Sequence, residues 1–459
     1  MNKRWQVFTI TALGIFMVYL DGTIVNIAFP AIGGTFAHAS RPELSWVLNA
    51  YGITFAALLL GAGQLADRLG RRRIFFAGLG VFTLGSGLCG LASSAPVLIA
   101  DRVLQACGAA LLAPTSMALL LDAFPLGLRT TVVGLYGAVA ALAVALGPSL
   151  GSLIVEHAGW RWVFLLNLPV GLLAWGWGRR VLRESRDSSA RGRPDAPGLA
   201  LLTLTMGALA LAIVQGNDWG WGDPRVLCAF ALAGCGVPLS IHRAARHPVP
   251  VIDLSLFAVP AFGLANLAMV LFTAAFYGGL LSHVLFLTTT WRYSLVQAGL
   301  ALTPAPLCAT VAGAAAAHLA ARYGHRAVIL PGIGCFAAGL LLLHLNLGAS
   351  PAFAREWLLP NLLLGSGVGL ALPTLSSAGV AALPATKLAM GSAMGNTSRQ
   401  FGAVLGVALL IAVLGAPTSL PALVSAFQRI YGLFMAMALL AGLVCLALGR
   451  PRPGTVVPW

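Results

Sequence analysis

Asp21 and Arg102 are the charged residues whose positions in the sequence most strongly suggest chemistry. Asp21 lies near the middle of a long apolar segment, residues 7–33, and Arg102 lies inside another, residues 97–121. A carboxylate at the centre of a bilayer is costly unless it is protonated, paired or hydrated. Burial favours its neutral form and a nearby cation favours its charged form, so its charge can depend on what fills a neighbouring cavity. We predict that Asp21 exchanges protons; the alternative is a static partner of a structural arginine.

Arg102 has two interpretations. Its side chain either faces a cavity, where it polarises Asp21 or relays its protonation state, or extends to the outer membrane surface as an anchor. Asp101 is its immediate neighbour in the chain and cannot share the same helix face. We take the first interpretation and assign Asp21 and Arg102 to proton coupling.

Other polar residues also fall inside apolar segments. Most of them should form structural hydrogen bonds, and we select Asn26, Gln105 and His283 as candidates for lining a substrate cavity. Residues 147–151, Gly-Pro-Ser-Leu-Gly, remove one helical hydrogen bond at the proline and let another backbone approach at the glycines. This segment should bend or pack closely. The remaining polar residues of this kind are Asn266, Asn396 and Gln400.

The composition excludes a soluble protein. Of 459 residues, 59% are hydrophobic and 9% are charged, whereas a soluble chain has about a quarter of its residues charged. A phosphate-binding loop is excluded because neither Lys3 nor Lys387 follows a glycine, so any transport must be secondary. No histidine precedes a glutamate and no G-x-S-x-G nucleophile motif occurs. We expect a membrane protein that is not an enzyme and requires no cofactor or metal.

The basic residues predict the orientation. The chain has 28 Lys and Arg against 13 Asp and Glu, an excess that in a soluble protein would suggest nucleic acid. Here the basic residues gather in short loops, and alternate loops carry 20 of the 28 while the opposite loops carry six. Because cytoplasmic loops are rich in Lys and Arg, we predict that both termini lie in the cytoplasm. The bilayer of the cell (inner) membrane, and not nucleic acid, is then the expected partner.

Fourteen apolar segments are long enough to be spanning helices of about 20 residues each. The weakest is 224–242, and a twelve-span alternative would turn 196–242 into a loop, although that region is as apolar as its neighbours. We therefore predict an all-α membrane protein with 14 transmembrane helices. The segments are 7–33, 44–64, 74–94, 97–121, 130–155, 161–182, 196–215, 224–242, 261–288, 295–320, 327–346, 355–380, 388–415 and 427–449.

A polar stretch at 179–197 separates two halves that carry a weak internal repeat. Asp-Arg-Leu-Gly-Arg-Arg at 67–72 corresponds to Ala-Arg-Tyr-Gly-His-Arg at 321–326. Such repeats are typical of carriers whose halves rock about a central site. We predict an N-terminal six-helix bundle at 1–185, a linker with an additional transmembrane hairpin at 186–250, and a C-terminal six-helix bundle at 251–459. The two bundles should be related by pseudo-twofold symmetry.

Five segments together resemble the major facilitator superfamily, and specifically its branch of 14-span drug:proton antiporters. The first is Leu20-Asp21-Gly22-Thr23-Ile24-Val25-Asn26-Ile27-Ala28-Phe29-Pro30, which resembles the first-span signature of that branch. The second, Gly63-Gln64-Leu65-Ala66-Asp67-Arg68-Leu69-Gly70-Arg71-Arg72, is similar to the inner-loop motif of the superfamily. The others are Arg102 to Gln105 with Gly108, Gly147-Pro148 with Gly151, and the stretch from Gly159 to Pro169. Three small residues, Ala106, Ala143 and Ser152, replace glycines of these motifs.

The resemblance implies roles for several residues. Arg102 would assist proton transfer, Asp67 would help to latch the halves at the inner face, and the segment around Pro148 would seal the cavity during exchange. The hairpin at 196–242 would be the additional pair that distinguishes 14-span from 12-span members. We assign conformational gating to Gly63, Asp67, Arg68, Gly70, Arg71, Gly147, Pro148 and Gly151.

The function predicted is proton-coupled export of an amphiphilic drug-like compound or metabolite by alternating access. Few acids lie in the apolar segments, so we expect a small-molecule substrate with at most one positive charge, and a monomeric protein. Two alternatives use the same sequence features. One is a proton-coupled or facilitated importer of a small solute on the same fold, and the other is a membrane receptor or scaffold without transport activity.

Overall fold

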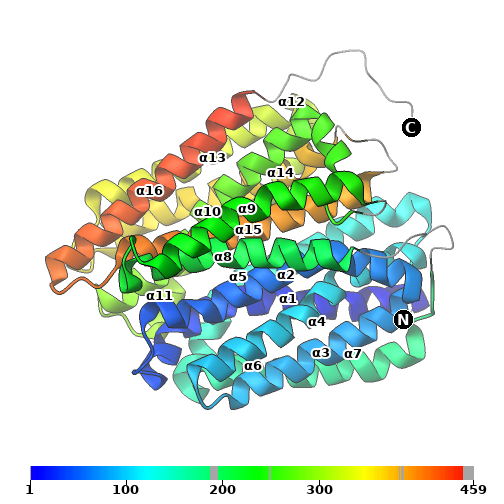
Figure 1. The fold of residues 1–459 in the computed structure, drawn as a ribbon, viewed down its shortest axis with the longest axis horizontal. Coiled ribbons are helices and arrows are strands. Elements are labelled where there is room, and N and C mark those ends of the chain that lie inside the picture. Colours follow the sequence, from blue (N-terminus) through cyan, green and yellow to red (C-terminus); the bar gives the residue numbers. More distant parts are fainter. Residues whose placement is uncertain (1, 187–194, 248–249, 382, 384–386, 448–459) are drawn as a thin grey trace. The chain divides into compact units, whose positions relative to one another are not determined.

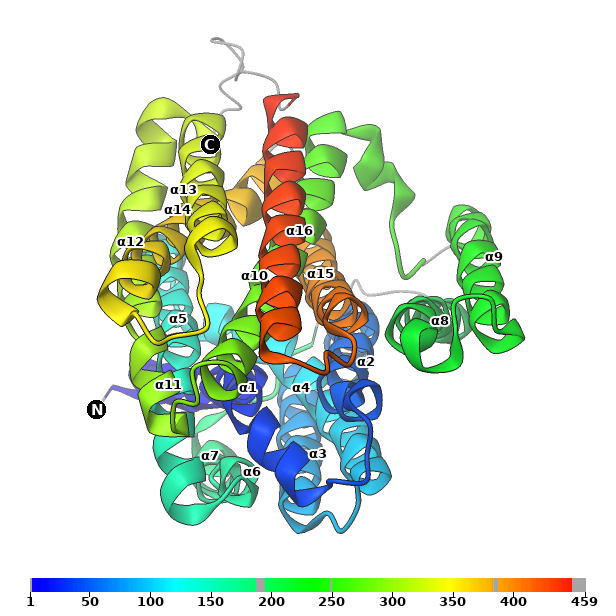
Figure 2. The ribbon, with the colours of Figure 1, turned by 90° about the vertical axis from the view of Figure 1, so that its left-hand side faces the viewer.

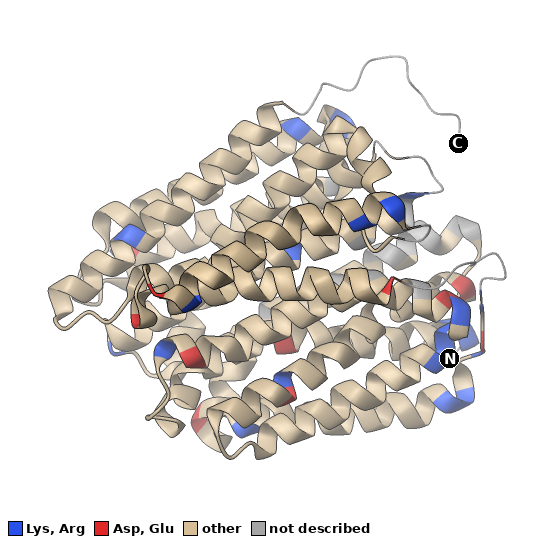
Figure 3. Cartoon of the chain, in the orientation of Figure 1, with Lys and Arg blue, Asp and Glu red and all other residues tan. Residues whose placement is uncertain are grey.

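The computed structural model describes residues 2–186, 195–247, 250–381, 383 and 387–447. The regular elements of these residues are helices (Figure 1). Eleven of the helices are long and apolar enough to cross a membrane, and up to 13 spans result if each of two bent helix pairs is one span. The protein is therefore an all-helical, multi-pass membrane protein. Figure 3 shows that most charged residues lie near the helix ends, as this architecture requires.

Two compact units make up the chain. The first comprises Met1–Ile252, His283–Thr303 and Val407–Gly415, and the second comprises Asp253–Ser282, Pro304–Gly406 and Ala416–Trp459. The helices α8 and α9 group with the first unit by their contacts. The predicted domain limits at 1–185, 186–250 and 251–459 stay a prediction.

The first unit is built on helices that pack against both sequence neighbours and more distant segments. Within it α1 packs on α4, α5 and α7, α3 packs on α4 and α7, and α2 packs on α4 and α8. The helices are α1 (Lys3–Thr35), α2 (Arg41–Leu69), α3 (Arg71–Leu91), α4 (Ala95–Ala123), α5 (Leu126–Ala158), α6 (Arg161–Leu165), α7 (Asn167–Val181), α8 (Ala196–Trp219), α9 (Pro224–Arg246) and α11 (Leu295–Leu302).

In the second unit α14 packs against both α12 and α13, and α13 also packs on α16. Two helices, α10 and α15, contribute residues to both units. The elements are η1 (Leu254–Ala258), α10 (Pro260–Thr289), α12 (Pro304–Tyr323), α13 (His325–Asn346), η2 (Phe353–Trp357), α14 (Leu358–Ala381), α15 (Leu388–Leu414) and α16 (Leu420–Leu446).

The predicted span at 161–182 is interrupted, and a proline explains why. It consists of the short helix α6 and the 15-residue helix α7, which begins at Asn167. Pro169 has no N–H group to donate to the carbonyl of Leu165, so the helical hydrogen-bond pattern breaks at this point. Neither piece reaches the length of a spanning helix by itself.

Helices α8 and α9 lie side by side, joined by a short turn (Figure 2). Asp195 caps the start of α8, where its Oδ1 accepts a hydrogen bond from the Gly198 N–H at 2.9 Å. The same oxygen accepts one from Arg243 Nε, near the end of α9, at 2.7 Å. One buried carboxylate thus closes the end of this helix pair.

Glycines with positive φ form the turns of the internal repeat. Gly70 joins α2 to α3 with φ 112°, and Gly324 joins α12 to α13 with φ 85°. An L side chain is strained at such angles, so each repeat uses glycine at the corresponding position. The sequence echo therefore corresponds to the same local turn in both units.

Candidate functional site

The three side chains of Asp21, Arg102 and Gln105 form a buried, closed cluster. Arg102 Nη1 donates to Asp21 Oδ2 at 2.6 Å and to Gln105 Oε1 at 2.6 Å. Gln105 Nε2 donates to the other carboxylate oxygen of Asp21 at 2.8 Å. Asp21 and Arg102 are each 1% exposed, so both oxygens of a fully buried carboxylate are bound by donors from α4.

Helix geometry explains how the cluster assembles. Arg102 and Gln105 are three residues apart on α4 and therefore share one face. That face meets α1, which supplies Asp21. Helix α4 also approaches α3 closely, because α3 has a glycine at the point of contact. At Gly85 of α3, an added Cβ would lie 2.7 Å from the backbone nitrogen of Gln105. Small residues thus bring the polar side chains within hydrogen-bonding distance.

The guanidinium of Arg102 lies inside the first unit and does not extend to its surface. Its Nε donates to the Val47 carbonyl of α2 at 3.1 Å. Its Cζ lies 4.0 Å from the centre of the Tyr51 ring and 5.6 Å from that of Phe164, distances typical of cation–π contacts. This geometry is not that of an anchor at the outer membrane surface, which was the second predicted arrangement. The role of Arg102 in proton transfer stays a prediction.

The cluster extends to two residues that were not selected from the sequence, Ser86 and Asn167. Gln105 Nε2 donates to Ser86 Oγ at 3.1 Å, Asn167 Nδ2 donates to the same oxygen at 3.0 Å, and Ser86 Oγ donates to the Phe164 carbonyl at 2.8 Å. Both are polar residues within apolar segments, and this position is the feature of the sequence that could have marked them as members of the cluster. Their partners depend on the rotation of α3 and α7, which the sequence does not specify.

The chemistry of this cluster follows from its charges. Hydrogen bonds from a cation to a carboxylate are short and strong when both groups are charged. A proton added to Asp21 would remove the charge that Arg102 binds and leave a buried guanidinium without an anionic partner. Each of the two charges, of Asp21 and of Arg102, therefore depends on the other for its stability in the apolar interior.

Two predicted cavity residues lie outside this cluster. Asn26 is buried on α1, and its Nδ2 donates to the carbonyls of Gly22 and Thr23 on the same helix. His283 is half-buried on α10. Of the three candidates for a substrate cavity, only Gln105 contacts Asp21. The assignment of Asn26 and His283 stays a prediction.

At the turn from α2 to α3, the inner-loop motif forms an ion network. Arg71 Nη2 lies 2.8 Å from Asp67 Oδ1, and Arg71 Nη1 lies 2.7 Å from Asp122 Oδ2 at the end of α4. Ser185 Oγ, which follows α7, donates to the same Asp122 oxygen at 2.7 Å. Asp122 was not selected from the sequence, because an acid near the end of a span does not reveal its partner.

Glu184 is a second acid that was not selected from the sequence. Its carboxylate accepts hydrogen bonds from the Arg72 N–H at 3.1 Å and from the Arg73 N–H at 3.3 Å. These are unpaired amides of the first turn of α3, where a negative charge is favoured by the helix dipole. Glu184 therefore fixes the segment after α7 to the start of α3.

The other predicted gating residues of this motif have simpler surroundings. Gly63 is half-buried on α2, and an added Cβ would lie 3.9 Å from Pro114 Cβ of α4. Arg68 is exposed in the last turn of α2. Gly70 has a positive φ and lies against Glu184, whose Cδ would be 2.6 Å from an added Cβ.

The glycine–proline segment of α5 is bent and closely packed, as its sequence predicts. The helix bends by 40° between Leu135–Val144 and Leu146–Ala158, where Pro148 cannot donate to the Val144 carbonyl. Added Cβ atoms at Gly147 and Gly151 would overlap Thr23 and Ile24 of α1. Close approach of α5 to the helix that carries Asp21 therefore requires glycine at both positions.

On its other side, the same segment meets α11. Ser149 Oγ lies 2.9 Å from Thr303 Oγ1, and an added Cβ at Gly299 would overlap the Ser152 side chain. Glu156 Oε2 accepts a hydrogen bond from the Val296 N–H at 3.0 Å. The segment of α5 that contains Pro148 therefore packs on both α1 and α11.

Comparison with known proteins identifies the family. The model of the Major Facilitator Superfamily matches residues 11–406. The chain belongs to this superfamily. Among curated relatives, it is 35% identical to the multidrug resistance protein Stp of Mycobacterium tuberculosis over 417 residues, covering 90% of this chain and 77% of the relative.

Other superfamily relatives carry names of antibiotic exporters. The chain is 32% identical to the tetracenomycin C resistance and export protein of Streptomyces glaucescens, covering 89% of this chain and 76% of the relative. It is 35% identical to the cephamycin export protein CmcT of Amycolatopsis lactamdurans, covering 88% and 84%.

The solved structure of the POT family transporter PepTSo shows the same fold, with a TM-score of 0.68 at 15% identity over 97% of each chain. A bacterial homologue of the human transporters PepT1 and PepT2 also has a TM-score of 0.68, at 14% identity over 97% of this chain and 98% of the other.

Proposed function

We propose that this protein is a proton-coupled secondary transporter that exports an amphiphilic drug-like compound or metabolite across the cell membrane by alternating access. The observation that carries the proposal is the buried cluster of Asp21, Arg102 and Gln105. A scaffold without transport has no use for such a costly group, whereas a carrier driven by protons needs one. The names of the relatives, which are resistance and export proteins, support export rather than import.

In the proposed cycle, Asp21 takes up a proton from outside and releases it to the cytoplasm. In the protonated state Arg102 loses its anionic partner, which favours a rearrangement of α4 relative to α1 and release of the substrate. Loss of the proton restores the pair and favours loading. If one proton exchanges for one monovalent cation, no net charge moves and the pH gradient supplies the energy. A neutral substrate would add about 2.3 kcal/mol per 100 mV of membrane potential.

The network at the α2–α3 turn would act as the inner latch in this cycle. Arg71 contacts two carboxylates that come from different helices, Asp67 and Asp122, so separation of those helices requires at least one ion pair to break. The bend at Pro148 would supply the corresponding movement in α5, sealing the cavity while the helices rearrange.

We further propose 14 transmembrane helices with both termini in the cytoplasm. The helices α6 and α7 together would form one of them, and α8 and α9 would be the additional hairpin beside two six-helix bundles related by pseudo-twofold symmetry. The arginine-rich loops support this orientation. We expect the protein to function as a monomer in the inner membrane, with protons and one small molecule as its partners.

Transport in proteoliposomes tests the function. A fluorescent amphiphilic cation is loaded and a pH gradient is imposed on vesicles that contain the wild-type chain, Asp21→Asn or Asp101→Asn. Asp101 is a matched control because it is a half-buried acid next to Arg102 and lies outside the cluster. We expect gradient-driven transport by the wild type and Asp101→Asn, and loss of gradient dependence in Asp21→Asn.

Three outcomes would contradict parts of this proposal. Equal gradient-driven rates in Asp21→Asn and the wild type would remove Asp21 from the coupling role. Accumulation in the direction of the proton flux would indicate an importer. Absence of transport across a broad panel of substrates would favour the receptor or scaffold.

A further inference from the structure

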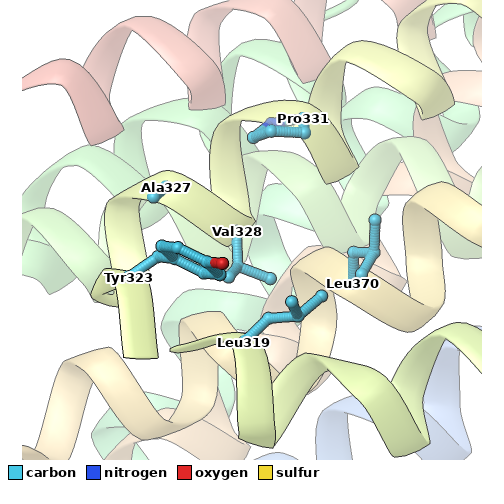
Figure 4. A pocket seen from close by; sticks show the side chains of 6 residues that line it. All are labelled: Leu319, Tyr323, Ala327, Val328, Pro331 and Leu370. Carbon is cyan, nitrogen blue, oxygen red and sulfur yellow. The ribbon is translucent and has the colours of Figure 1, made fainter. Parts of the chain in front are cut away.

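An apolar groove lies between α12 and α13 in the second unit (Figure 4). Both helices pack on α14 more closely than on each other. A gap therefore remains between α12 and α13. Its volume is about 300 Å³, and it is lined by Leu319, Tyr323, Ala327, Val328, Pro331 and Leu370. The half-buried Leu370 of α14 forms part of the lining, and the exposed residues Tyr323, Ala327 and Pro331 border the opening.

One hydrogen-bond acceptor in this groove follows from the proline. Pro331 lies inside α13 and has no N–H group, so the carbonyl of Ala327 lacks its usual helical donor. A carbonyl without its helical donor is unfavourable in hydrocarbon, so this wall of the groove is more polar than its side chains alone suggest. Both Ala327 and Pro331 line the groove.

The end of the groove at the α12–α13 turn is basic. Arg322 and Arg326 flank this turn, and the guanidinium of Arg322 lies 5.2 Å from the centre of the Tyr323 ring, which lines the groove. Among the described residues, neither arginine forms an ion pair with a carboxylate. No side chain caps the start of α13, so its first amides add to the positive potential.

We propose that this groove binds an anionic phospholipid of the cytoplasmic leaflet, with one acyl chain between α12 and α13 and the headgroup phosphate at Arg322 and Arg326. Apolar side chains match the acyl chain, and the phosphate is matched by two arginines that have no carboxylate partner among the described residues. Basic pockets between transmembrane helices on the cytoplasmic side are sites of this kind. The leaflet rests on the proposed orientation, whereas lipid binding does not depend on the proposed transport.

Photo-crosslinking tests the site directly. The full-length chain is reconstituted in phosphatidylcholine bilayers with a trace of phosphatidylglycerol that carries a diazirine in its acyl chain, and crosslinked residues are mapped by peptide mass spectrometry. We expect labelling of Leu319, Tyr323, Val328 or Leu370. Unlabelled phosphatidylglycerol should compete, and additional phosphatidylcholine should not.

Two pairs of variants separate the contribution of the headgroup to lipid binding from the contribution of the apolar groove. Arg322→Gln with Arg326→Gln should weaken competition by phosphatidylglycerol roughly thirtyfold, from two surface charges, whereas Arg246→Gln, an exposed arginine at the end of α9, should have no effect. Ala327→Phe should fill the groove and abolish labelling.

The control for filling is Ala338→Phe, since Ala338 is also exposed on α13 and does not line the groove. Equal competition by phosphatidylcholine in the wild type would overturn the selectivity for anionic lipid. Undiminished labelling in Ala327→Phe, or equal loss in Ala338→Phe, would overturn the site.

Discussion

Substitution of Asp21 by asparagine should destabilise the first unit through the arginine it leaves behind. Removing one partner of a buried ion pair costs about 3–5 kcal/mol, because the other charge stays buried without compensation. Arg102 is 1% exposed, so water cannot replace the carboxylate. It keeps Gln105 Oε1 at 2.6 Å and the Val47 carbonyl at 3.1 Å, and these acceptors place the expected loss near the lower end, about 3 kcal/mol.

A double-mutant cycle isolates this effect. Thermal unfolding of the purified chain in detergent is compared for the wild type, Asp21→Asn, Arg102→Gln and the double variant. At about 2–4 °C per kcal/mol, Asp21→Asn should lower Tm by roughly 6–12 °C. The double variant should be more stable than the sum of the single effects predicts, because it contains no unpaired charge.

The matched control is Asp101→Asn, which alters an acid next to Arg102 but outside the cluster and should leave Tm close to that of the wild type. Two results would refute the reasoning. One is an Asp21→Asn variant as stable as the wild type, and the other is a double variant whose loss equals the sum of the single losses. Either would show that the pair observed in the structure carries no coupling free energy.

Three further predictions concern other parts of the chain. Asp122→Asn should reduce transport several-fold yet cost about 1 kcal/mol or less in stability, since its ion pair is partly exposed; transport and Tm are measured together, and a large loss of Tm would contradict a gating role. Burial raises the pKa of Asp195, but hydrogen bonds from Arg243 and the Gly198 N–H lower it more, so its pKa lies below the ordinary value. Its stabilisation of the α8–α9 pair is therefore complete above about pH 4 and lost as pH falls through the lower folded value; hydrogen exchange at the start of α8 should show this acid dependence in the wild type and not in Arg243→Gln. Gly324→Ala should destabilise by about 1–2 kcal/mol because of its positive φ, whereas Gly334→Ala, with open space for a Cβ, should stabilise slightly in the same unfolding assay.

The cluster at Asp21 illustrates what can be predicted from sequence. A charge inside an apolar segment must be paired, so the apolar residues around Asp21 and Arg102 are enough to single out both. Their connection to Ser86 and Asn167 is different, because serine and asparagine occur in many spans and their contacts depend on helix rotation. The sequence therefore reveals the costly group and its counter-ion but not the hydrogen bonds that orient them.

The helices show a similar division. Apolar length predicts where spans lie, and the family model confirms the superfamily that the motifs indicated. Interruptions arise from single residues, such as Pro169 between α6 and α7, and they lower the number of spans that helix length alone identifies. Glu184 and Asp122 could not be selected as site residues from the sequence. The role of an acid near a helix end depends on the amides or the guanidinium group that the fold places beside it.

The two repeats share a turn but differ in how their charges are satisfied. At Gly70, Glu184 occupies the first amides of α3, and Asp67 and Asp122 bind Arg71. At Gly324, the sequence has alanine in the position of Asp67, and the described residues supply no carboxylate to the two arginines of that turn. The first turn thus has three acids beside its four arginines, while the second has two arginines without a carboxylate partner among the described residues, beside an apolar groove. An anion of the membrane surface matches this difference between the repeats, and it is the partner that the crosslinking experiment tests.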